Sequence, residues 1–227
     1  MDINSDFAEF FGIMLGDGCL SVFQNQGRTR YIIRIDGNSK TDLSFFVHIQ
    51  ELIFKITGRK TKIRKRKDCN GIFISMHNKK LVIKLNKDFG FPIGKKKDMR
   101  IPESILNYPK LKKCLLRGFF DTDGCIYFTK NNTNKRHYPC IDLTTVDQTL
   151  LNQLRKVLNQ LNFNIKNLKS NRSIRIYGKE NINKWMNEIG SNNPDKLSKY
   201  LFWKKYGYCP KSNELEMKER INKVGPA

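Results

Sequence analysis

The hydrophobic residues of this chain follow one succession of patterns twice. In each half, an apolar run at helical spacing is followed by two runs that alternate between apolar and polar residues. A segment with apolar residues every three or four positions comes next, and two further alternating runs and a short amphipathic segment complete the half. Helices bury one side at a period of about 3.6 residues and strands alternate their two faces, so each half predicts the order αββαββα.

The predicted elements fall at corresponding places in the two halves. The expected helices cover 43–56, 79–89, 150–161 and 179–189, and the expected strands cover 19–23, 31–35, 60–67, 71–76, 125–128, 140–143, 164–169 and 173–177. The predicted fold class is α+β, with a four-stranded antiparallel sheet in each of two pseudo-symmetric halves. Helices on one face of such a sheet leave the other face open, and two of these sheets together would form a saddle. The predicted division is 1–94 for the first half, 95–112 for a linker, 113–200 for the second half and 201–227 for a C-terminal extension.

A nine-residue motif opens both halves. Residues 10–18 and residues 116–124 are each an apolar run with a small residue at the third and seventh positions, and each run ends in Asp-Gly. Small residues four apart share one face of a helix and let two helix backbones approach closely. The two runs therefore predict a pair of packed helices that bring Asp17 and Asp123 together at one end.

Two aspartates at helix C-termini are in an unfavourable place. Each carboxylate meets the negative end of a helix dipole, and a second carboxylate nearby adds repulsion. A divalent cation between them would relieve both effects, and a site with oxygen ligands alone favours Mg²⁺ over zinc. The simpler interpretation is that the motif only packs helices, but packing does not require Asp in both copies.

The net charge of the chain is +22, from 43 basic and 21 acidic residues, and both halves carry the excess. Such a charge favours a polyanionic partner over a small neutral ligand. Nonspecific binding to RNA, ribosomes or anionic lipid is the alternative from composition alone. The sequence shows no signal peptide and no apolar run of the ~18 residues that would span a bilayer. No metal-ligand spacing links the six cysteines to the three histidines, so we expect reduced thiols in an intracellular protein, cytoplasmic or organellar.

The paired motifs, their spacing and the succession of elements resemble the LAGLIDADG homing endonucleases in their single-chain, two-motif form, of the DOD type. The likeness covers roughly residues 7–200 and includes secondary marks at 78–81, 89–97, 100–103 and 113–124. The first motif departs from the pattern, because it carries Leu15 where many members have an acid. The matching Asp121 of the second motif is expected to be structural.

The resemblance implies a site-specific endonuclease that hydrolyses both strands of a long, asymmetric double-stranded DNA target. It implies divalent cations, Mg²⁺ in two or more copies, shared by the two motif aspartates, and a monomer with an internal pseudo-two-fold axis. The implied metal-site residues are Asp17, Asp123 and the residues before them, Gly16 and Thr122. The implied catalytic residues are the two aspartates with Lys97, Lys196, Lys199, Asn38 and Thr145, whose polar side chains would order water and polarise the scissile phosphates.

DNA recognition is expected to rest on the strands. Arginine suits guanine, asparagine suits adenine and lysine mostly serves phosphates. The candidate DNA-binding residues are Arg28, Arg30, Arg34, Lys62, Arg64 and Arg66 in the first half, and Lys130, Asn132, Lys135, Arg136, Asp142, Lys166, Lys169, Arg172 and Arg175 in the second. Because the two sets differ, the target is expected to be an imperfect palindrome at best.

Other functions are compatible with the same fold. Some proteins of this family bind intron RNA as maturases, including the RNA of their own intron, and others regulate transcription without cutting DNA. In those proteins the motif acids are free to change, and both acids are present here, which favours cutting. An intein-embedded nuclease is a third alternative, but the chain has no splice-junction Cys or Ser at its start and no terminal His-Asn.

Overall fold

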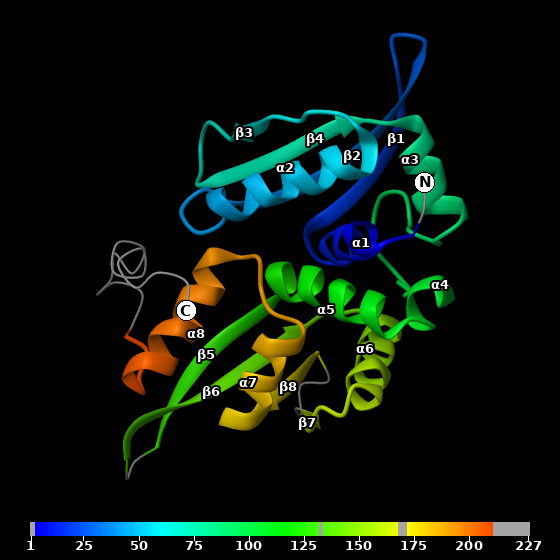
Figure 1. Ribbon diagram of the computed structural model, residues 1–227. Helices are drawn as coiled ribbons and strands as arrows, with labels where there is room; N and C mark the ends of the chain where they lie inside the picture. Colours follow the sequence, from blue (N-terminus) through cyan, green and yellow to red (C-terminus); the bar gives the residue numbers. More distant parts are fainter. Residues whose placement is uncertain (1–2, 132–133, 168–171, 211–227) are drawn as a thin grey trace.

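The computed structural model describes residues 3–131, 134–167 and 172–210, and the predicted order of elements is present in both halves (Figure 1). The first half contains α1 (Ser5–Asp17), β1 (Gly18–Asn25), β2 (Arg28–Asn38), α2 (Leu43–Thr57), β3 (Ile63–Lys65), β4 (Gly71–His77) and α3 (Lys79–Lys87). The second half contains α5 (Pro109–Asp123), β5 (Gly124–Asn131), β6 (Asn134–Thr144), α6 (Gln148–Gln160), β7 (Ile165–Asn167), β8 (Ser173–Tyr177) and α7 (Lys179–Glu188). Two further helices are α4 (Glu103–Leu106) and α8 (Pro194–Tyr206).

Each half forms its own antiparallel sheet. The strand orders are β1-β2-β4-β3 and β5-β6-β8-β7, so the two sheets have the same topology. The registers also correspond, since Gly18 pairs with Ile35 and Gly124 pairs with Leu143. The prediction of two pseudo-symmetric α+β halves is confirmed.

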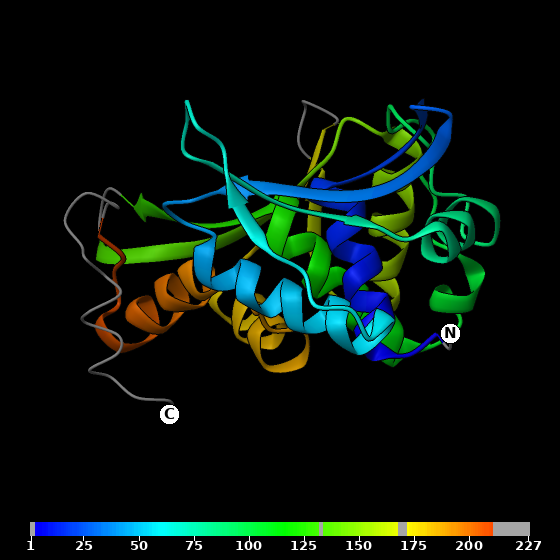
Figure 2. The ribbon, with the colours of Figure 1, turned by 90° about the horizontal axis from the view of Figure 1, so that it is seen from above.

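Alternation along the strands decides which side chains face the helices. In β2, Ile33 and Ile35 are buried in the core, whereas Arg34 and Asp36 point to the opposite face. The same alternation continues across the second sheet, where Ile141 is buried and its neighbour in register, Ile176, is buried as well. We call the faces opposite the helices the open faces. Figure 2 shows the strands on one side of the molecule and α2, α7 and α8 on the other.

Helices α1 and α5 pack against each other and join the two halves. A Cβ atom on Gly12 would collide with the carbonyl oxygen of Leu115, and one on Gly118 would collide with that of Glu9. Two helix backbones therefore touch at two equivalent points, where only a hydrogen atom fits. The predicted packing of the small-residue positions is what the structure shows.

Replacing Gly12 or Gly118 by alanine is expected to destabilise the protein, because the added methyl group meets backbone rather than a flexible side chain. Overpacking of this kind costs about 1–3 kcal/mol in the free energy of unfolding. Urea unfolding monitored by circular dichroism measures the change. A variant as stable as the wild type would show that the helix pair separates at no cost.

A buried ion pair crosses between the halves along the same helix pair. Glu9, in α1, is 2 % exposed, and its Oε2 accepts hydrogen bonds from Nε and Nη2 of Arg117 in α5. Its Oε1 lies 2.6 Å from Nε2 of His48 and accepts a 2.6 Å hydrogen bond from the side chain of Asn192. The position of Glu9 has no acidic counterpart in the second motif helix, where Leu115 stands instead.

The connection between the halves overlaps the predicted linker at 95–112, and the exact division into domains stays a prediction. Helix α5 begins at Pro109, so the second half starts before 113, and α8 continues to Tyr206, past the predicted boundary at 200. Met99 and Ile101 are 2 % exposed, and their backbone N–H groups donate to Asp147 and Gln153 of the second half. The connection is a packed segment because its apolar side chains join the core.

Candidate active site at the paired helix ends

The last turns of α1 and α5 bring the two motif aspartates together. A Cβ on Gly16 would collide with Oγ1 of Thr122 and would lie 3.4 Å from Cγ of Asp123. Asp17 ends α1 and Asp123 ends α5, and the next residue in each case begins a strand. The acids therefore converge at the point where the helix pair meets the two sheets.

The surroundings of both carboxylates disfavour their charged form. Asp17 is open to solvent on one side, but protein atoms surround it elsewhere. Desolvation by these atoms, and then the charge of Asp123, raises the pKa of Asp17 to about 7. Desolvation likewise raises the pKa of Asp123, while Lys96 and Lys196 act in the opposite direction. A site that holds two carboxylates under repulsion is suited to a bound cation.

Two lysines cap the same helix ends. Nζ of Lys96 donates to the carbonyl oxygens of Leu15 and Gly16 in α1, and Nζ of Lys196 donates to those of Phe120 and Thr122 in α5. A positive charge is favoured at a helix C-terminus, where the last carbonyls have no partner within the helix. Both ammonium groups thereby stand beside the aspartates, and desolvation lowers the pKa of each.

The lysine that reaches the end of α1 is Lys96, one residue before the predicted Lys97, whose catalytic role stays a prediction. Lys97 is exposed, whereas Lys96 is half-buried at the end of α1. Three lysines stand together at 95–97, and their sequence alone gives no means to choose among them. Of the two candidates in the second half, Lys196 reaches the helix end, while Nζ of Lys199 forms a 2.7 Å ion pair with Asp195 one turn away in α8.

Asn38 and Thr145 use their side chains in turns at the ends of β2 and β6. The Oδ1 atom of Asn38 accepts from the backbone N–H of Lys40, and Oγ1 of Thr145 accepts from that of Asp147. Their predicted role in ordering water stays a prediction. Thr122 donates its hydroxyl to the carbonyl oxygens of Gly118 and Phe119, and its own carbonyl oxygen accepts from Nζ of Lys196.

The groups at the helix ends fit a hard divalent cation. The two carboxylates lie at adjoining helix ends, and the carbonyl oxygens of Gly16 and Thr122 belong to the same last turns. All of these donors are oxygen atoms, which Mg²⁺ and Ca²⁺ prefer and which zinc does not require. Among the described residues, no group of three or more His, Cys, Asp or Glu side chains forms a closed metal cage. The donors therefore leave room for water and substrate oxygens.

The open faces hold several of the predicted DNA-binding residues that the structure describes. Arg34 pairs in register with Cys19 and Ser75, and Arg64 pairs with Phe73, so their side chains share the open face of the first sheet. In the second sheet, Asp142, Arg175 and Lys166 form one row across three strands. Arg28 is exposed at the start of β2, where it pairs with Asn25, and Lys62 and Arg172 are exposed just before β3 and β8. The side chains of Lys130, Asn132, Lys135, Arg136 and Lys169 lie outside the described part of the chain.

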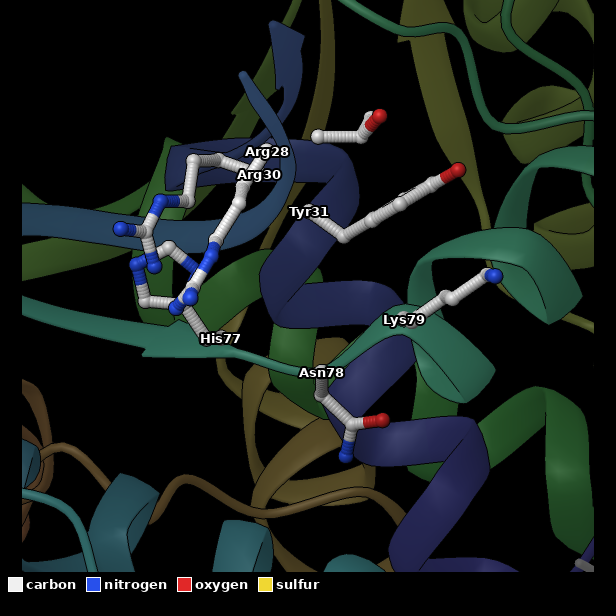
Figure 3. A pocket seen from close by; sticks show the side chains of 7 residues that line it. Arg28, Arg30, Tyr31, His77, Asn78 and Lys79 are labelled. Carbon is white, nitrogen blue, oxygen red and sulfur yellow. The ribbon is translucent and has the colours of Figure 1, made fainter. Parts of the chain in front are cut away.

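A polar pocket extends the basic surface at one end of the first sheet. It has a volume of about 460 Å³ and is lined by Arg28, Thr29, Arg30, Tyr31, His77, Asn78 and Lys79. Figure 3 shows Arg28, Arg30 and His77 gathered on one side, whereas Tyr31 and Lys79 point the other way. Sequence patterns assigned no binding role to His77 or Lys79, because residues 77–79 meet residues 28–31 only through the pairing of β2 with β4.

Part of the second half matches a known protein family. Residues 111–190 match the family described as LAGLIDADG-like domain. The resemblance to the LAGLIDADG family is confirmed. A search of curated proteins finds no match.

Solved structures share the fold over most of their length. One is I-DmoI in complex with DNA and Ca, with a TM-score of 0.59 and 17% identity over 87% of this chain and 97% of that one. Another is the I-LtrWI LAGLIDADG homing endonuclease bound to target DNA, with a TM-score of 0.57 and 15% identity. This match covers 89% of this chain and 90% of that one. A third is the LAGLIDADG homing endonuclease I-GzeII in complex with its DNA target, with a TM-score of 0.57 and 14% identity. This match covers 98% of this chain and 97% of that one.

The departure in the first of the two paired motifs has a structural explanation. Leu15 is buried at the position that matches Asp121. Asp121 is also buried, and its carboxylate accepts hydrogen bonds from the hydroxyl of Ser191 and the backbone N–H of Asn192. Burial, partly offset by these bonds, raises the pKa of Asp121 to about 6. The side chain at this position therefore serves packing in one half and loop attachment in the other.

No helix in the described part of the chain has the length and apolar content required to cross a membrane.

Proposed function

We propose that this chain is a homing endonuclease that cuts both strands of a long, asymmetric double-stranded DNA target, as a monomer with an internal pseudo-two-fold axis. The observation that carries the proposal is the convergence of Asp17 and Asp123 at the ends of two packed helices, between two basic open faces. The LAGLIDADG fold and the DNA complexes of structural neighbours support it. The proposed cofactor is Mg²⁺, in two or more copies shared by the aspartates.

The residues at the helix ends would have different roles in phosphodiester hydrolysis. Asp17 and Asp123, with the carbonyl oxygens of Gly16 and Thr122, would hold the cations. Bound Mg²⁺ would activate water and neutralise charge on the scissile phosphate. Lys96 and Lys196 place a positive charge beside each strand and stabilise the negative charge that develops on the phosphate oxygens. The open faces hold the duplex so that each scissile phosphate lies at the helix ends.

Cleavage of a DNA library tests this function. Supercoiled plasmids that carry randomised inserts, or the sequences flanking the gene, are incubated with the protein and Mg²⁺, and linear products are sequenced. We expect one long target that is cut on both strands. Tight binding to intron RNA with no nicking of any plasmid would support the maturase function instead.

Replacing Lys96 by methionine is expected to reduce cleavage by about 10²- to 10³-fold, because a preorganised charge beside the phosphate is lost. Lys97→Met is the matched control, since it removes the same charge from an exposed neighbour, and it is expected to change the rate by less than about three-fold. Single-turnover rates on the cognate plasmid measure both. A larger loss in Lys97→Met than in Lys96→Met would reverse the assignment.

A further inference from the structure

The open face of each sheet contains an arginine that a neighbouring aspartate holds along one edge. In the first half, Nε of Arg34 donates to Oδ2 of Asp36 at 2.9 Å, and Nη2 donates to Oδ1 at 2.8 Å. In the second half, Nε of Arg175 donates to Oδ1 of Asp142 at 2.8 Å, and Nη2 donates to Oδ2 at 2.9 Å. Both pairs are bidentate, the geometry that fixes a guanidinium most firmly.

An aromatic ring supports each guanidinium from below. Cζ of Arg34 lies 4.2 Å from the ring centroid of Phe73, and Cζ of Arg175 lies 5.4 Å from that of Tyr127. The Tyr127 hydroxyl also donates to Asp142 at 3.3 Å. Carboxylate and ring together remove most of the freedom of a long side chain, which would otherwise be lost on binding.

The acids leave one edge of each guanidinium for a ligand. An arginine has five N–H groups, and the aspartate uses those of Nε and one of Nη2. Within the described part of the chain, Nη1 of Arg34 and Nη1 of Arg175 have no protein acceptor. The remaining Nη1–Nη2 edge matches the O6 and N7 atoms of guanine in the major groove. Each arginine is about a third exposed, so this edge is accessible.

The carboxylates are hard to explain as aids to affinity. Asp36 and Asp142 lie on the open faces of a chain with net charge +22, where a negative charge repels the phosphates of a duplex. Asp36 also accepts a hydrogen bond from Arg66 at 2.6 Å, so it offsets two cations. Their presence lowers nonspecific attraction while it fixes the direction of a base-reading group, which is the pattern expected for a specificity device.

We propose that Arg34 and Arg175 each read a guanine, and that Asp36 and Asp142 are the positioning residues that hold them for it. The inference rests on the proposed DNA-binding function. Both arginines lie in the row of the sheet that begins two residues after a motif aspartate, at Cys19 and at Cys125. The guanines should therefore lie near the scissile bonds.

The two guanines are expected at unequal distances from the centre of the target. Arg34 stands on β2, opposite Cys19, whereas the corresponding place on β6, opposite Cys125, holds Asp142. Arg175 is one strand further out, on β8. The pseudo-symmetric fold thus presents its two arginines in different places, so the guanine contacts would break the symmetry of the site.

Selection of bound duplexes tests the proposal without cleavage. A randomised double-stranded DNA library is bound to the full chain in EDTA, and the bound fraction is sequenced for the wild type, Arg34→Lys and Asp36→Asn, and for Arg175→Lys and Asp142→Asn. The wild type is expected to prefer guanine at one position in each half-site by about 10- to 100-fold. Each lysine variant keeps the positive charge but loses the paired N–H donors of the guanidinium. It should lose the preference at one position and retain its affinity for nonspecific duplex within about two-fold.

The asparagine variants separate orientation from charge. Asp36→Asn is expected to weaken the guanine preference at the Arg34 position by about 10-fold and to bind nonspecific duplex more tightly, because a negative charge is gone. Lys62→Met is the control, and it is expected to lose the same factor of affinity for every DNA sequence. Guanine preferences that survive in Arg34→Lys and Asp36→Asn would overturn this inference but leave the proposed function standing. A wild type that selects no sequence would overturn the proposed function as well.

Discussion

Replacing Asp17 or Asp123 by asparagine is expected to lower the rate of double-strand cleavage by about 10³-fold or more. Each substitution removes a charged ligand from the proposed cation site, and a bound cation contributes several kcal/mol to stabilising a phosphoryl transition state. Single-turnover cleavage of supercoiled plasmid in Mg²⁺ measures the loss, and the gel also shows whether nicked circles accumulate. Unchanged cleavage in the double variant would remove the proposed chemistry.

The same two variants should melt at a higher temperature than the wild type when no metal is present. The two carboxylates repel each other, and Asp17 carries a raised pKa because its charged form is disfavoured in the fold. Asparagine keeps the shape and removes the repulsion. Asp88→Asn is the matched control, because Asp88 is an exposed aspartate at the end of α3. A gain in stability together with lost activity is the behaviour of a functional site, whereas a loss in both would indicate a structural role.

Replacing Glu9 by alanine is expected to lower the free energy of unfolding by about 3–5 kcal/mol. Removal of one partner from a buried ion pair leaves the other charge without compensation, which here is the guanidinium of Arg117 between the two halves. Urea unfolding at neutral pH measures the change. Glu51→Ala is the control from an exposed position in α2 and should change the unfolding free energy by less than about 0.5 kcal/mol.

A double variant separates the buried charge from the loss of packing. Glu9→Met combined with Arg117→Met is expected to recover most of the stability lost by Glu9→Ala, because neither charge then lies buried without a partner. A double variant less stable than Glu9→Ala would mean that the unpaired charge of Arg117 is not what costs stability.

The stability contributed by Glu9 also depends on pH. Burial by itself would raise its pKa, but hydrogen bonds from His48, Arg117 and Asn192 and the charge of Arg117 outweigh burial and lower the pKa to about 2. A carboxyl with a lowered pKa in the folded state stabilises fully above its ordinary value of 4.5, and the stabilisation is lost as the pH falls towards 2. The difference in unfolding free energy between wild type and Glu9→Gln is therefore expected to shrink over this window. A difference independent of pH would contradict the ionised state of Glu9.

Much of the fold and the centre of the site could be predicted from local patterns. The strand predicted at 31–35 is present as part of β2, where Ile33 and Ile35 alternate with Arg34. The repeated motif located Asp17 and Asp123, since the small residues Gly12 and Gly118 indicated which faces of the two helices would meet. These signals are readable because a helix or strand places neighbouring residues by a fixed period.

Local sequence patterns could not predict contacts that depend on the register of distant strands or on the path of a turn. The choice of Lys96 over Lys97 depends on the path of the chain through Gly90, Gly94 and Asp98, all with positive φ.

What the sequence by itself determined is therefore the repeat, its elements, the basic character and the pair of motif acids. Only the tertiary structure decided which lysine caps α1, that Glu9 meets Arg117 across 108 positions of the chain, and that Asp142 holds Arg175 across 33. The physical reason is that a helix or strand fixes its own periodicity. The partner of a side chain on another element is fixed only when the sheets have paired and the helices have packed.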